Sequence, residues 1–407
     1  MNEIASEKSD VIILGGGLVG LTLAIALDRN GISSVVIDPA NPDAVVAPGF
    51  DGRVSAVASA SWRMLEVIGV GRHLEGQGCP IREIRVSDGL KPGILDFRPE
   101  EEEGPLGIMF ENRLLREALR AASLEAKNIR LRMPNRAVDV VRDASGVTAT
   151  LDSGEVVKGA LLIAAEGRRS PTREAAGLNV ARWDYHHVAI ISAFEHEVPH
   201  DNVAYEIFYP AGPFALLPML PGNRSALVWT VSAKDAPGML KLSDRGFWAE
   251  AEKQMGGFLG KLTPVAPRQS YPLNFHHAAH ITDERLVLVG DAAHGIHPIA
   301  GQGLNLGFRD VAALAEVLTE GVRIGLDCGD AQLLARYERW RGLDTFMVAT
   351  ATDTLTRLFG IPGDAASAVR RFGLGMVQRI PPLKRSFMAE ARGESGALPK
   401  LLQGMPI

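Results

Sequence analysis

The glycine-rich segment from Gly15 to Gly20 limits the fold of this chain more than any other stretch of its sequence. It reads G-G-G-L-V-G, follows the apolar run Val11 to Leu14, and precedes a helical pattern from Leu18 to Asn30. Glycines at these spacings permit a tight turn, a close approach of backbone to a pyrophosphate, and close packing of helix on strand. Val35 to Asp38 has the pattern of the next strand, so the N-terminus predicts a βαβ unit.

The residue that ends this second strand adds to the prediction. Asp38 lies about 20 residues beyond the glycines, where an acidic side chain can accept a ribose hydroxyl. A helix that begins near Leu18 directs free N–H groups and the positive end of its dipole at phosphates. The segment therefore predicts dinucleotide binding. By itself it does not distinguish FAD from NAD.

Composition and charge exclude several classes of protein. With 407 residues, the chain is long enough for two or three structural units. Its net charge of −5 argues against a general nucleic-acid binder. Two cysteines, Cys79 and Cys328, are too few for a disulfide framework or a cysteine zinc site, and they indicate a reducing cytosol. The polar N-terminus and the lack of any apolar run of about 18 residues predict a cytoplasmic protein. Peripheral attachment to the inner face of the membrane stays open.

Two further regions have different patterns. Short strand-like runs alternate with turn residues between Val147 and Val231, which predicts an antiparallel sheet in a separate domain. Leu286 to Val289 returns to the pattern of a buried strand, and Phe308 to Leu318 carries one apolar helix face. From Leu333 onward the pattern is largely helical.

The segment that follows Leu286 predicts the second half of the cofactor site. It reads LVLVGDAAHGIHPIAGQGLNLGFRD and places Asp291 after a strand, where it can accept a ribose or ribityl hydroxyl. A flexible turn from Pro298 to Gly303 precedes a helix, whose N-terminus can stabilise negative charge near flavin N1 and O2. This second half favours FAD.

These residues resemble the G-D-A-A-H…P…G-x-G-x-N motif of the single-component flavin aromatic hydroxylases, which share the para-hydroxybenzoate hydroxylase fold. The middle motif of that family, D-G-x-x-S-x-x-R, stands here as E-G-R-R-S-P-T-R from Glu166 to Arg173. The first residue of the motif is Glu instead of Asp, so the geometry of its carboxylate must differ from that in the family. Segments 51–56, 80–88, 111–119, 212–218 and the tail from Tyr337 are similar to the ubiquinone-biosynthesis branch of the family, and the resemblance covers essentially the whole chain.

The resemblance implies an FAD-dependent monooxygenase that hydroxylates the aromatic ring of a polyprenylphenol in ubiquinone biosynthesis. It would use NAD(P)H and O2 through a flavin C4a-hydroperoxide. Because only one G-x-G-x-x-G occurs, NAD(P)H is expected as a transient co-substrate. Two alternatives remain: a hydroxylase of a small soluble phenol, and a non-catalytic flavin-binding subunit of a biosynthetic complex.

The same resemblance implies an α/β fold (α+β overall). A Rossmann-like FAD-binding domain would comprise residues 1–75, 108–180 and 275–330. An inserted, mainly antiparallel β-sheet domain for the substrate would comprise 76–107 and 181–274, and a helical C-terminal region would comprise 331–407.

The expected site residues bind the cofactor, and no catalytic acid or base is assigned because the flavin carries the chemistry. Arg53 and Arg113 either contact FAD or form surface ion pairs. His297 either lines the pocket or only packs. The expected cofactor-binding residues are Gly15, Gly17, Leu18, Val19, Gly20, Asp38, Arg53, Arg113, Glu166, Gly167, Asp291, Pro298, Gly301, Gln302, Gly303, Leu304 and Asn305.

Other readings of the histidines and serines are not favoured. Gly295 between His294 and His297 indicates a turn instead of a rigid ligand face, so no metal site is expected. The pairs His186-His187 and His276-His277 are interpreted as loop or strand residues unrelated to the site. No G-x-S-x-G elbow supports a hydrolase.

The expected partners are a polyprenylated phenol and O2, with no nucleic acid. Contact with other ubiquinone-biosynthesis enzymes and homo-oligomer formation stay open. A long prenyl tail has to be drawn from a membrane. The stretch from Arg379 to Lys400 mixes apolar side chains with five cations, so it is either a surface that rests on anionic lipid or an ordinary exposed helix.

Overall fold

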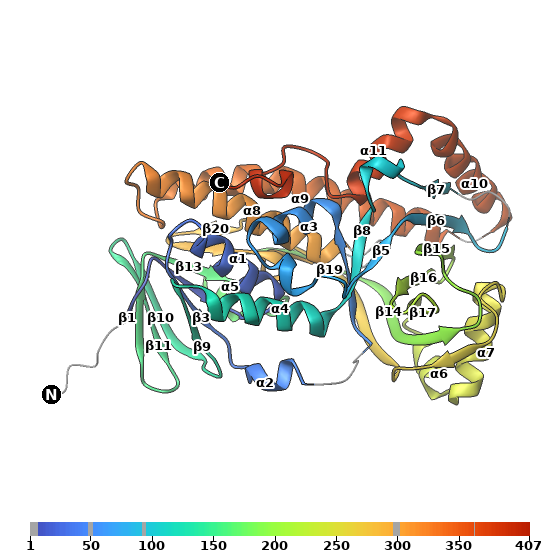
Figure 1. The fold of residues 1–407 in the computed structure, drawn as a ribbon, viewed down its shortest axis with the longest axis horizontal. Helices are drawn as coiled ribbons and strands as arrows, with labels where there is room; N and C mark the ends of the chain where they lie inside the picture. The colour runs from blue at the N-terminus through green and yellow to red at the C-terminus, as the bar shows by residue number, and fades with distance from the viewer. Residues whose placement is uncertain (1–6, 48–51, 92–94, 296–301, 362) are drawn as a thin grey trace.

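A parallel sheet near the N-terminus and a large mixed sheet lie in the two halves of an elongated molecule (Figure 1). The computed structural model describes residues 7–47, 52–91, 95–295, 302–361 and 363–407, with the backbone alone at 343–344 and 346–357. The long helices α8 (Gln302–Arg323) and α9 (Ala331–Gly360) run along one side of the molecule (Figure 1). The α/β prediction is confirmed.

The parallel sheet has the strand order β20-β21-β13-β2-β3-β9. All its neighbours pair in parallel except β20 and β21 at one edge. Its central strands are apolar along their whole length, because helices cover them and no face is left for water. The strands are β2 (Val11–Leu14), β3 (Ser34–Ile37), β9 (Ile129–Arg132), β13 (Leu161–Ala164), β20 (Thr282–Asp283) and β21 (Leu286–Leu288).

The first helix, α1 (Leu18–Asp28), joins β2 to β3 and completes the predicted βαβ unit. It ends two residues before the predicted Asn30, and Gly31 then turns the chain with a φ of +78°. Two small sheets flank this unit. One consists of β1 (Glu7–Lys8), β12 (Val156–Gly159), β11 (Gly146–Leu151) and β10 (Ala137–Asp143), and the other of β4 (Val54–Ala58), β8 (Gly107–Glu111) and β5 (Cys79–Ile81).

The large sheet has nine strands in the order β22-β19-β14-β17-β16-β15-β6-β7, with β18 beside β14. It is mainly antiparallel, as expected, but β15 and β6 pair in parallel. The expectation that this sheet begins near Val147 was wrong, because β11 belongs to the small four-stranded sheet and β13 to the parallel sheet. The strands are β6 (Glu83–Asp88), β7 (Leu95–Phe97), β14 (Val180–His196), β15 (Val203–Tyr209), β16 (Gly212–Met219), β17 (Arg224–Ser232), β18 (Leu262–Pro264), β19 (Gln269–Ala278) and β22 (His294–Gly295).

Helices cover the sheets and form the C-terminal region. One face of the large sheet packs against α7, with Phe247, Trp248 and Met255 in their common core. The other helices include α2 (Pro42–Val45), α3 (Ser59–Val67), α4 (Asn112–Glu125), α5 (Pro171–Ala175), α6 (Ala236–Lys241), α7 (Asp244–Met255), α10 (Asp364–Arg379) and α11 (Pro381–Ala391). Short 3₁₀ turns include η3 (Gly290–Ala292) and η5 (Lys400–Gln403). None of the helices in the described ranges combines the length and hydrophobicity that a membrane crossing requires.

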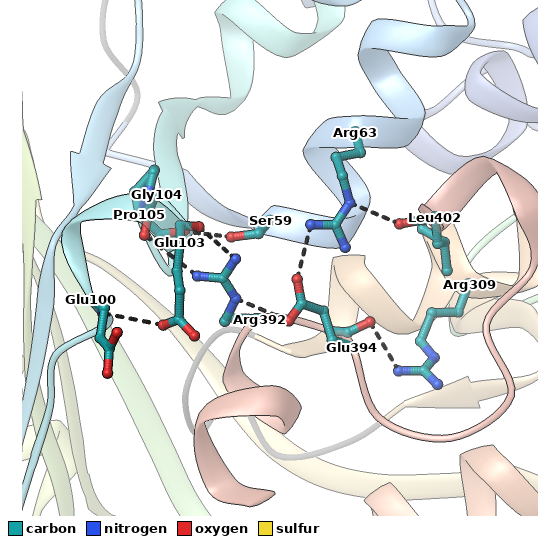
Figure 2. A network of polar contacts seen from close by, with 11 residues as sticks. Ser59, Arg63, Glu100, Glu103, Gly104, Pro105, Arg309, Arg392, Glu394 and Leu402 are labelled. Carbon is teal, nitrogen blue, oxygen red and sulfur yellow. Dashed lines mark hydrogen bonds and ion pairs between the residues drawn. The ribbon is translucent and has the colours of Figure 1, made fainter. Parts of the chain in front are cut away.

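The chain after α11 returns to the body of the molecule (Figure 2). Arg63 of α3 pairs with Glu394 at 2.8 Å and donates to the Leu402 carbonyl at 3.1 Å. Arg392 pairs with Glu394 at 3.0 Å and donates to the Glu103 carbonyl at 2.7 Å. The tail is therefore held between α3 and the loop before β8.

These contacts correct the interpretation of the tail as one lipid-facing surface. Three of its five cations are paired within the protein: Lys384 with Asp96, Arg392 with Glu394, and Lys400 with Glu320. Only Arg379 and Arg385 stay exposed without such a pair among the described residues.

A buried charge cluster joins α8 to two other segments. Asp310 of α8 accepts hydrogen bonds from the Gly290 amide at 2.8 Å, from His294 at 2.6 Å and from Arg341 of α9 at 2.7 Å. Burial alone would raise the pKa of Asp310, but the charges and hydrogen bonds of His294 and Arg341 outweigh burial and hold this pKa at about 2. The carboxylate is thus ionised and fixes the turn η3 against α8.

The variant Asp310→Asn should lose about 3–5 kcal/mol of unfolding free energy, because it leaves the buried Arg341 without its counter-ion. The depressed pKa makes the contribution of Asp310 fully present above its unfolded pKa near 3.8, and lost as the pH falls toward 2. Urea titrations at pH 7 and pH 3 measure both effects. The control Asp283→Asn breaks the exposed pair with Arg142 and should cost less than about 1 kcal/mol; equal losses in the two variants would contradict this account.

Candidate functional site: a cofactor cradle at the edge of the parallel sheet

The glycine turn follows β2 at the carboxyl edge of the parallel sheet. Gly15 has a φ of +107°, and a Cβ on it would lie 2.4 Å from the Ala165 carbonyl oxygen. A Cβ on Gly20 would lie 1.9 Å from the Gly15 oxygen. Side chains are therefore excluded at both positions by the protein itself. Gly17, by contrast, has no atom within 4 Å of the position of a Cβ, so its open side is where a ligand can approach.

Asp38 lies where the sequence predicted, directly after β3. One carboxylate oxygen accepts from the Gly16 amide at 2.7 Å, and the other accepts from the Ala40 amide at 2.7 Å. Asp38 therefore holds the glycine turn in place. A carboxylate has about four acceptor positions, so two remain for a ribose hydroxyl.

The two halves of the predicted site meet at Val19. A Cβ on Gly290 would lie 3.1 Å from Val19, and a Cβ on Gly307 would lie 2.7 Å from it. The first turn of α1, the turn η3 and the start of α8 can approach one another only because both positions are glycine. Segments almost 300 residues apart thus form one site at the carboxyl ends of the parallel strands, the usual place for ligands in such sheets.

Asp291 lies in η3 with its side chain 42 % exposed. Arg168 donates to it at 3.2 Å and also to the Asn274 side chain at 3.0 Å. His276 of β19 hydrogen-bonds the Asp291 carbonyl at 2.7 Å, and burial lowers the pKa of His276 to about 4, so the ring is neutral and donates. This contact shows that the interpretation of His276 as unrelated to the site was wrong. The sequence could not predict the contact, because it depends on the pairing of β19 with β14 and β22.

The middle motif makes several contacts within the protein. Glu166 accepts from the Ser170 hydroxyl at 2.7 Å and from the Thr172 amide at 3.3 Å. Arg173 is completely buried and donates to the carbonyls of Ala292 and Arg168, each at 2.8 Å. The motif thus fixes the chain beside Asp291. Gly167 has a φ of +79° with open space around it.

The start of α8 holds four of the predicted residues. Asn305 is buried, and its amide bonds the Ala58 N–H and the Ala56 carbonyl of β4, each at 2.9 Å. Gln302, Gly303 and Leu304 form the first turn, and Gly303, like Gly17, has no atom of the described residues within 4 Å of the position of a Cβ. The predicted residues His297, Pro298 and Gly301 lie outside the described residues.

The two predicted arginines contact other parts of the protein. Arg53 is exposed and lies over the Tyr271 ring, 5.8 Å from its centre. Arg113, in the first turn of α4, pairs with Glu117 at 2.7 Å. Of the two contacts expected for Arg113, the structure contains the ion pair, which is with Glu117.

Both helix N-termini suit an anionic cofactor. Neither α1 nor α8 has an acidic residue in its first turn, and Gly17 provides no side-chain cap for α1. In the described residues, no acidic side chain of either first turn therefore neutralises the positive end of the helix dipole. Among the described residues, no cluster of three or more His, Cys, Asp or Glu side chains could hold a metal ion.

The described cavities are small and lie apart from these turns. One of about 160 Å³ is lined by Trp62, Arg63, Ile108 and Arg392, among others, and so belongs to the tail network (Figure 2). The residues that sequence reasoning missed, Arg168, His276, Asp310 and Arg341, all act through contacts between distant segments. Arg168 and Asp310 lie within the motif segments 166–173 and 286–310, which gave a signal for both, whereas His276 and Arg341 lie outside these segments.

Comparisons with known proteins agree with this geometry. The family described as "FAD binding domain" matches residues 8–345. Ubiquinone hydroxylase UbiL of Rhodospirillum rubrum is 47% identical over 406 residues, which cover 99% of this chain and 94% of that protein. The 3-demethoxyubiquinol 3-hydroxylase of Escherichia coli is 32% identical, over 96% of this chain and 100% of that protein.

Solved structures show the same fold at low identity. The p-nitrophenol 4-monooxygenase PnpA of Pseudomonas putida superposes with a TM-score of 0.78 at 17% identity, over 96% of this chain and 100% of that chain. The expectation of FAD, which the glycine turn alone could not distinguish from NAD, is confirmed by the family match. The chain belongs to the FAD binding domain family, as an FAD-dependent monooxygenase similar throughout to the hydroxylases of ubiquinone biosynthesis.

Proposed function

We propose that this protein hydroxylates the aromatic ring of a polyprenylated phenol in ubiquinone biosynthesis, with NAD(P)H and O2 as co-substrates. The observation that carries the proposal is the close approach of the first turn of α1, the turn η3 and Gly307 of α8 around Val19. The similarity to two hydroxylases named for ubiquinone chemistry, over nearly their whole lengths, supports the substrate class.

We propose a role for each part of the cradle, which consists of the first turn of α1, Asp38, Asp291 and the start of α8. The amides at the start of α1 bind the pyrophosphate, Asp38 accepts a ribose hydroxyl, and Asp291 accepts a hydroxyl of the ribityl chain. The N-terminus of α8 stabilises negative charge on the isoalloxazine ring. When bound, FAD takes electrons from NAD(P)H and activates O2 for insertion into the ring. The protein orients the phenol and excludes water from it.

We assign the cofactor to residues 1–75, 108–180 and 275–330 and the substrate to 76–107 and 181–274. The contacts of one face of the large sheet, the face opposite to α7, support this division. Its apolar residues pack with Val54 and Ala56 of β4, which Asn305 ties to the start of α8. A phenol between this face and α8 lies close to the flavin and away from bulk water.

Purified holoprotein should oxidise NAD(P)H faster when a 2-polyprenylphenol is added, and mass spectrometry should find one added oxygen in the product. A small phenol without the tail is the matched comparison. Equal stimulation by both phenols favours the hydroxylase of a small soluble phenol. A protein that binds FAD but shows no stimulation by any phenol favours the non-catalytic subunit and contradicts the proposal.

The variant Asp291→Ala should fold normally but bind FAD about 10-fold more weakly, since it loses one hydrogen bond to a charged acceptor. The flavin absorbance per protein and the dissociation constant from fluorescence titration of the apoprotein measure this. Asp283→Ala, on the neighbouring strand β20, is the control and should keep full flavin. An Asp291→Ala protein with wild-type affinity for FAD would remove Asp291 from the cradle.

The membrane surface that fits a prenylated substrate lies on α10 and the start of α11. Val369, Phe372, Met376 and Ile380 follow one another at helical spacing and are 66, 70, 44 and 38 % exposed. The opposite face of α10 is buried, with Arg370 and Leu374 packed inward. Leu383 and Phe387 of α11 are also exposed. A helix that turns this many apolar side chains outward has the pattern of a helix lying in a membrane interface.

The charges around this surface favour anionic lipid. Arg379 and Arg385 are exposed next to the apolar side chains and pair with none of the described carboxylates. The surface lies at the end of the molecule opposite to β10 and β11 (Figure 1). Each such cation contributes about 1 kcal/mol near an anionic membrane surface.

Flotation with vesicles of phosphatidylcholine and phosphatidylglycerol tests this surface. The wild-type protein should float with the vesicles at low salt and less so at 0.5 M salt, because salt screens the charges. Phe372→Ser with Met376→Ser should abolish flotation. The control Val138→Ser with Val141→Ser removes exposed apolar side chains from β10 and should float normally. Equal flotation of both double variants would exclude α10 as the membrane contact.

A further inference from the structure

Glu206 is a buried acid that the proposed cofactor cradle does not use. It lies in the middle of β15, and 8 % of the residue is exposed. Its neighbours across the sheet are Ala215 on β16 and Val86 on β6, both apolar. None of the described residues donates a hydrogen bond to its carboxyl group or pairs with it.

The direction of Glu206 follows from the alternation of β15. It shares a face with Ala204 and Phe208, whereas Ile207 points into the core beneath α7. The cluster that contains Ala204 and Phe208 also includes Val54 and Ala56 of β4. Glu206 therefore lies on the face turned toward β4 and, through Asn305, toward the start of α8.

The charged groups on the same face already have partners of their own. Asp88 of β6 pairs with Arg370 of α10 at 3.0 Å and accepts from Ser367. Farther along the face, Glu195 pairs with Arg224 at 2.7 Å. No cation is left beside Glu206 among these groups, and burial raises the pKa of Glu206 to about 8. At pH 7 the carboxyl group is therefore largely neutral and can both donate and accept a hydrogen bond.

A buried carboxyl group without a partner lowers stability compared with an apolar side chain of similar size. Such a group in an otherwise apolar site is typical of ligand pockets, in which a few polar atoms orient a mostly hydrophobic ligand. The ring of a prenylated phenol has the complementary chemistry: it is apolar except for its oxygen substituents. The partner that Glu206 lacks among the described residues is thus of the kind that the substrate provides.

We propose that the carboxyl group of Glu206 hydrogen-bonds the ring hydroxyl of the phenol and so orients the ring toward the cofactor. This inference rests on the proposed function. It names Glu206 as the residue that distinguishes a phenol from the same ring without its hydroxyl.

The test is a double-mutant cycle between the protein and its ligand. The holoproteins are wild type, Glu206→Leu, Glu206→Gln and the control Glu250→Gln on α7, which lies on the opposite face of the sheet. The ligands are 2-prenylphenol and prenylbenzene, with dissociation constants from flavin fluorescence. Glu206→Leu should weaken binding of 2-prenylphenol about 10-fold, corresponding to one buried hydrogen bond. It should leave binding of prenylbenzene unchanged. Glu206→Gln keeps a hydrogen-bonding group and should lose less.

Product formed per NAD(P)H oxidised gives a second readout. Glu206→Leu should lower this ratio, whereas Glu250→Gln should match wild type. If both ligands lose affinity equally in Glu206→Leu, the effect is one of packing and the inference is overturned. If wild type itself binds neither ligand, the proposed function fails and this inference fails with it.

A stability measurement separates these outcomes from misfolding. The folded protein keeps the proton of Glu206 up to about pH 8, but the unfolded chain loses it near pH 4.5, so Glu206 destabilises the fold increasingly as the pH rises between these values. The Glu206→Leu variant should therefore melt above wild type, and the difference in Tm should widen from pH 5 to pH 8. A variant that melts below wild type at pH 8 would indicate a structural role and overturn the inference.

Discussion

One carboxylate inside α8 holds three separate segments in the arrangement that the cofactor cradle needs. Asp310 receives the Gly290 amide, the His294 ring and the Arg341 guanidinium, so the turn with Asp291, the strand β22 and the helix α9 share a single charged centre. Removing any one donor from a buried charge strongly destabilises the folded protein. The position of Asp291 therefore depends on Arg341 of α9, 50 positions away, which acts through Asp310 at the end of the predicted segment.

The local patterns of the sequence predicted the fold better than the contacts of the site. The strand, glycine turn and helix from Val11 to Asp28 depend on interactions between near neighbours, and their positions were predicted to within two residues. The contacts of Glu166 and Asn305 within the protein were less predictable. Glu166 accepts a hydrogen bond from Ser170, and Asn305 bonds the backbone of β4. His276 could not be recognised at all, since its contact with Asp291 requires the register of a long-range sheet.

The large sheet separates two environments with different requirements. Beneath α7 its side chains form a closed aromatic core that includes Phe214, Trp229 and Phe247. The opposite face meets the cofactor-binding part and α9, and Phe208 stacks on Phe359 there with ring centres 3.9 Å apart. A sheet that is rigid on one side can hold a ligand precisely on the other without ordering a loop at each binding event.

The turn η5, near residue 400, packs against α3 from the first part of the chain. Leu401 and Leu402 are buried in the core of the parallel sheet, and Arg63 of α3 binds the Leu402 carbonyl. During synthesis, α3 leaves the ribosome more than 300 residues before η5 exists. The apolar side chains of α3 that pack against η5 therefore stay exposed until that segment has been made, which lengthens the period in which a chaperone can bind them and a neighbouring chain can trap them.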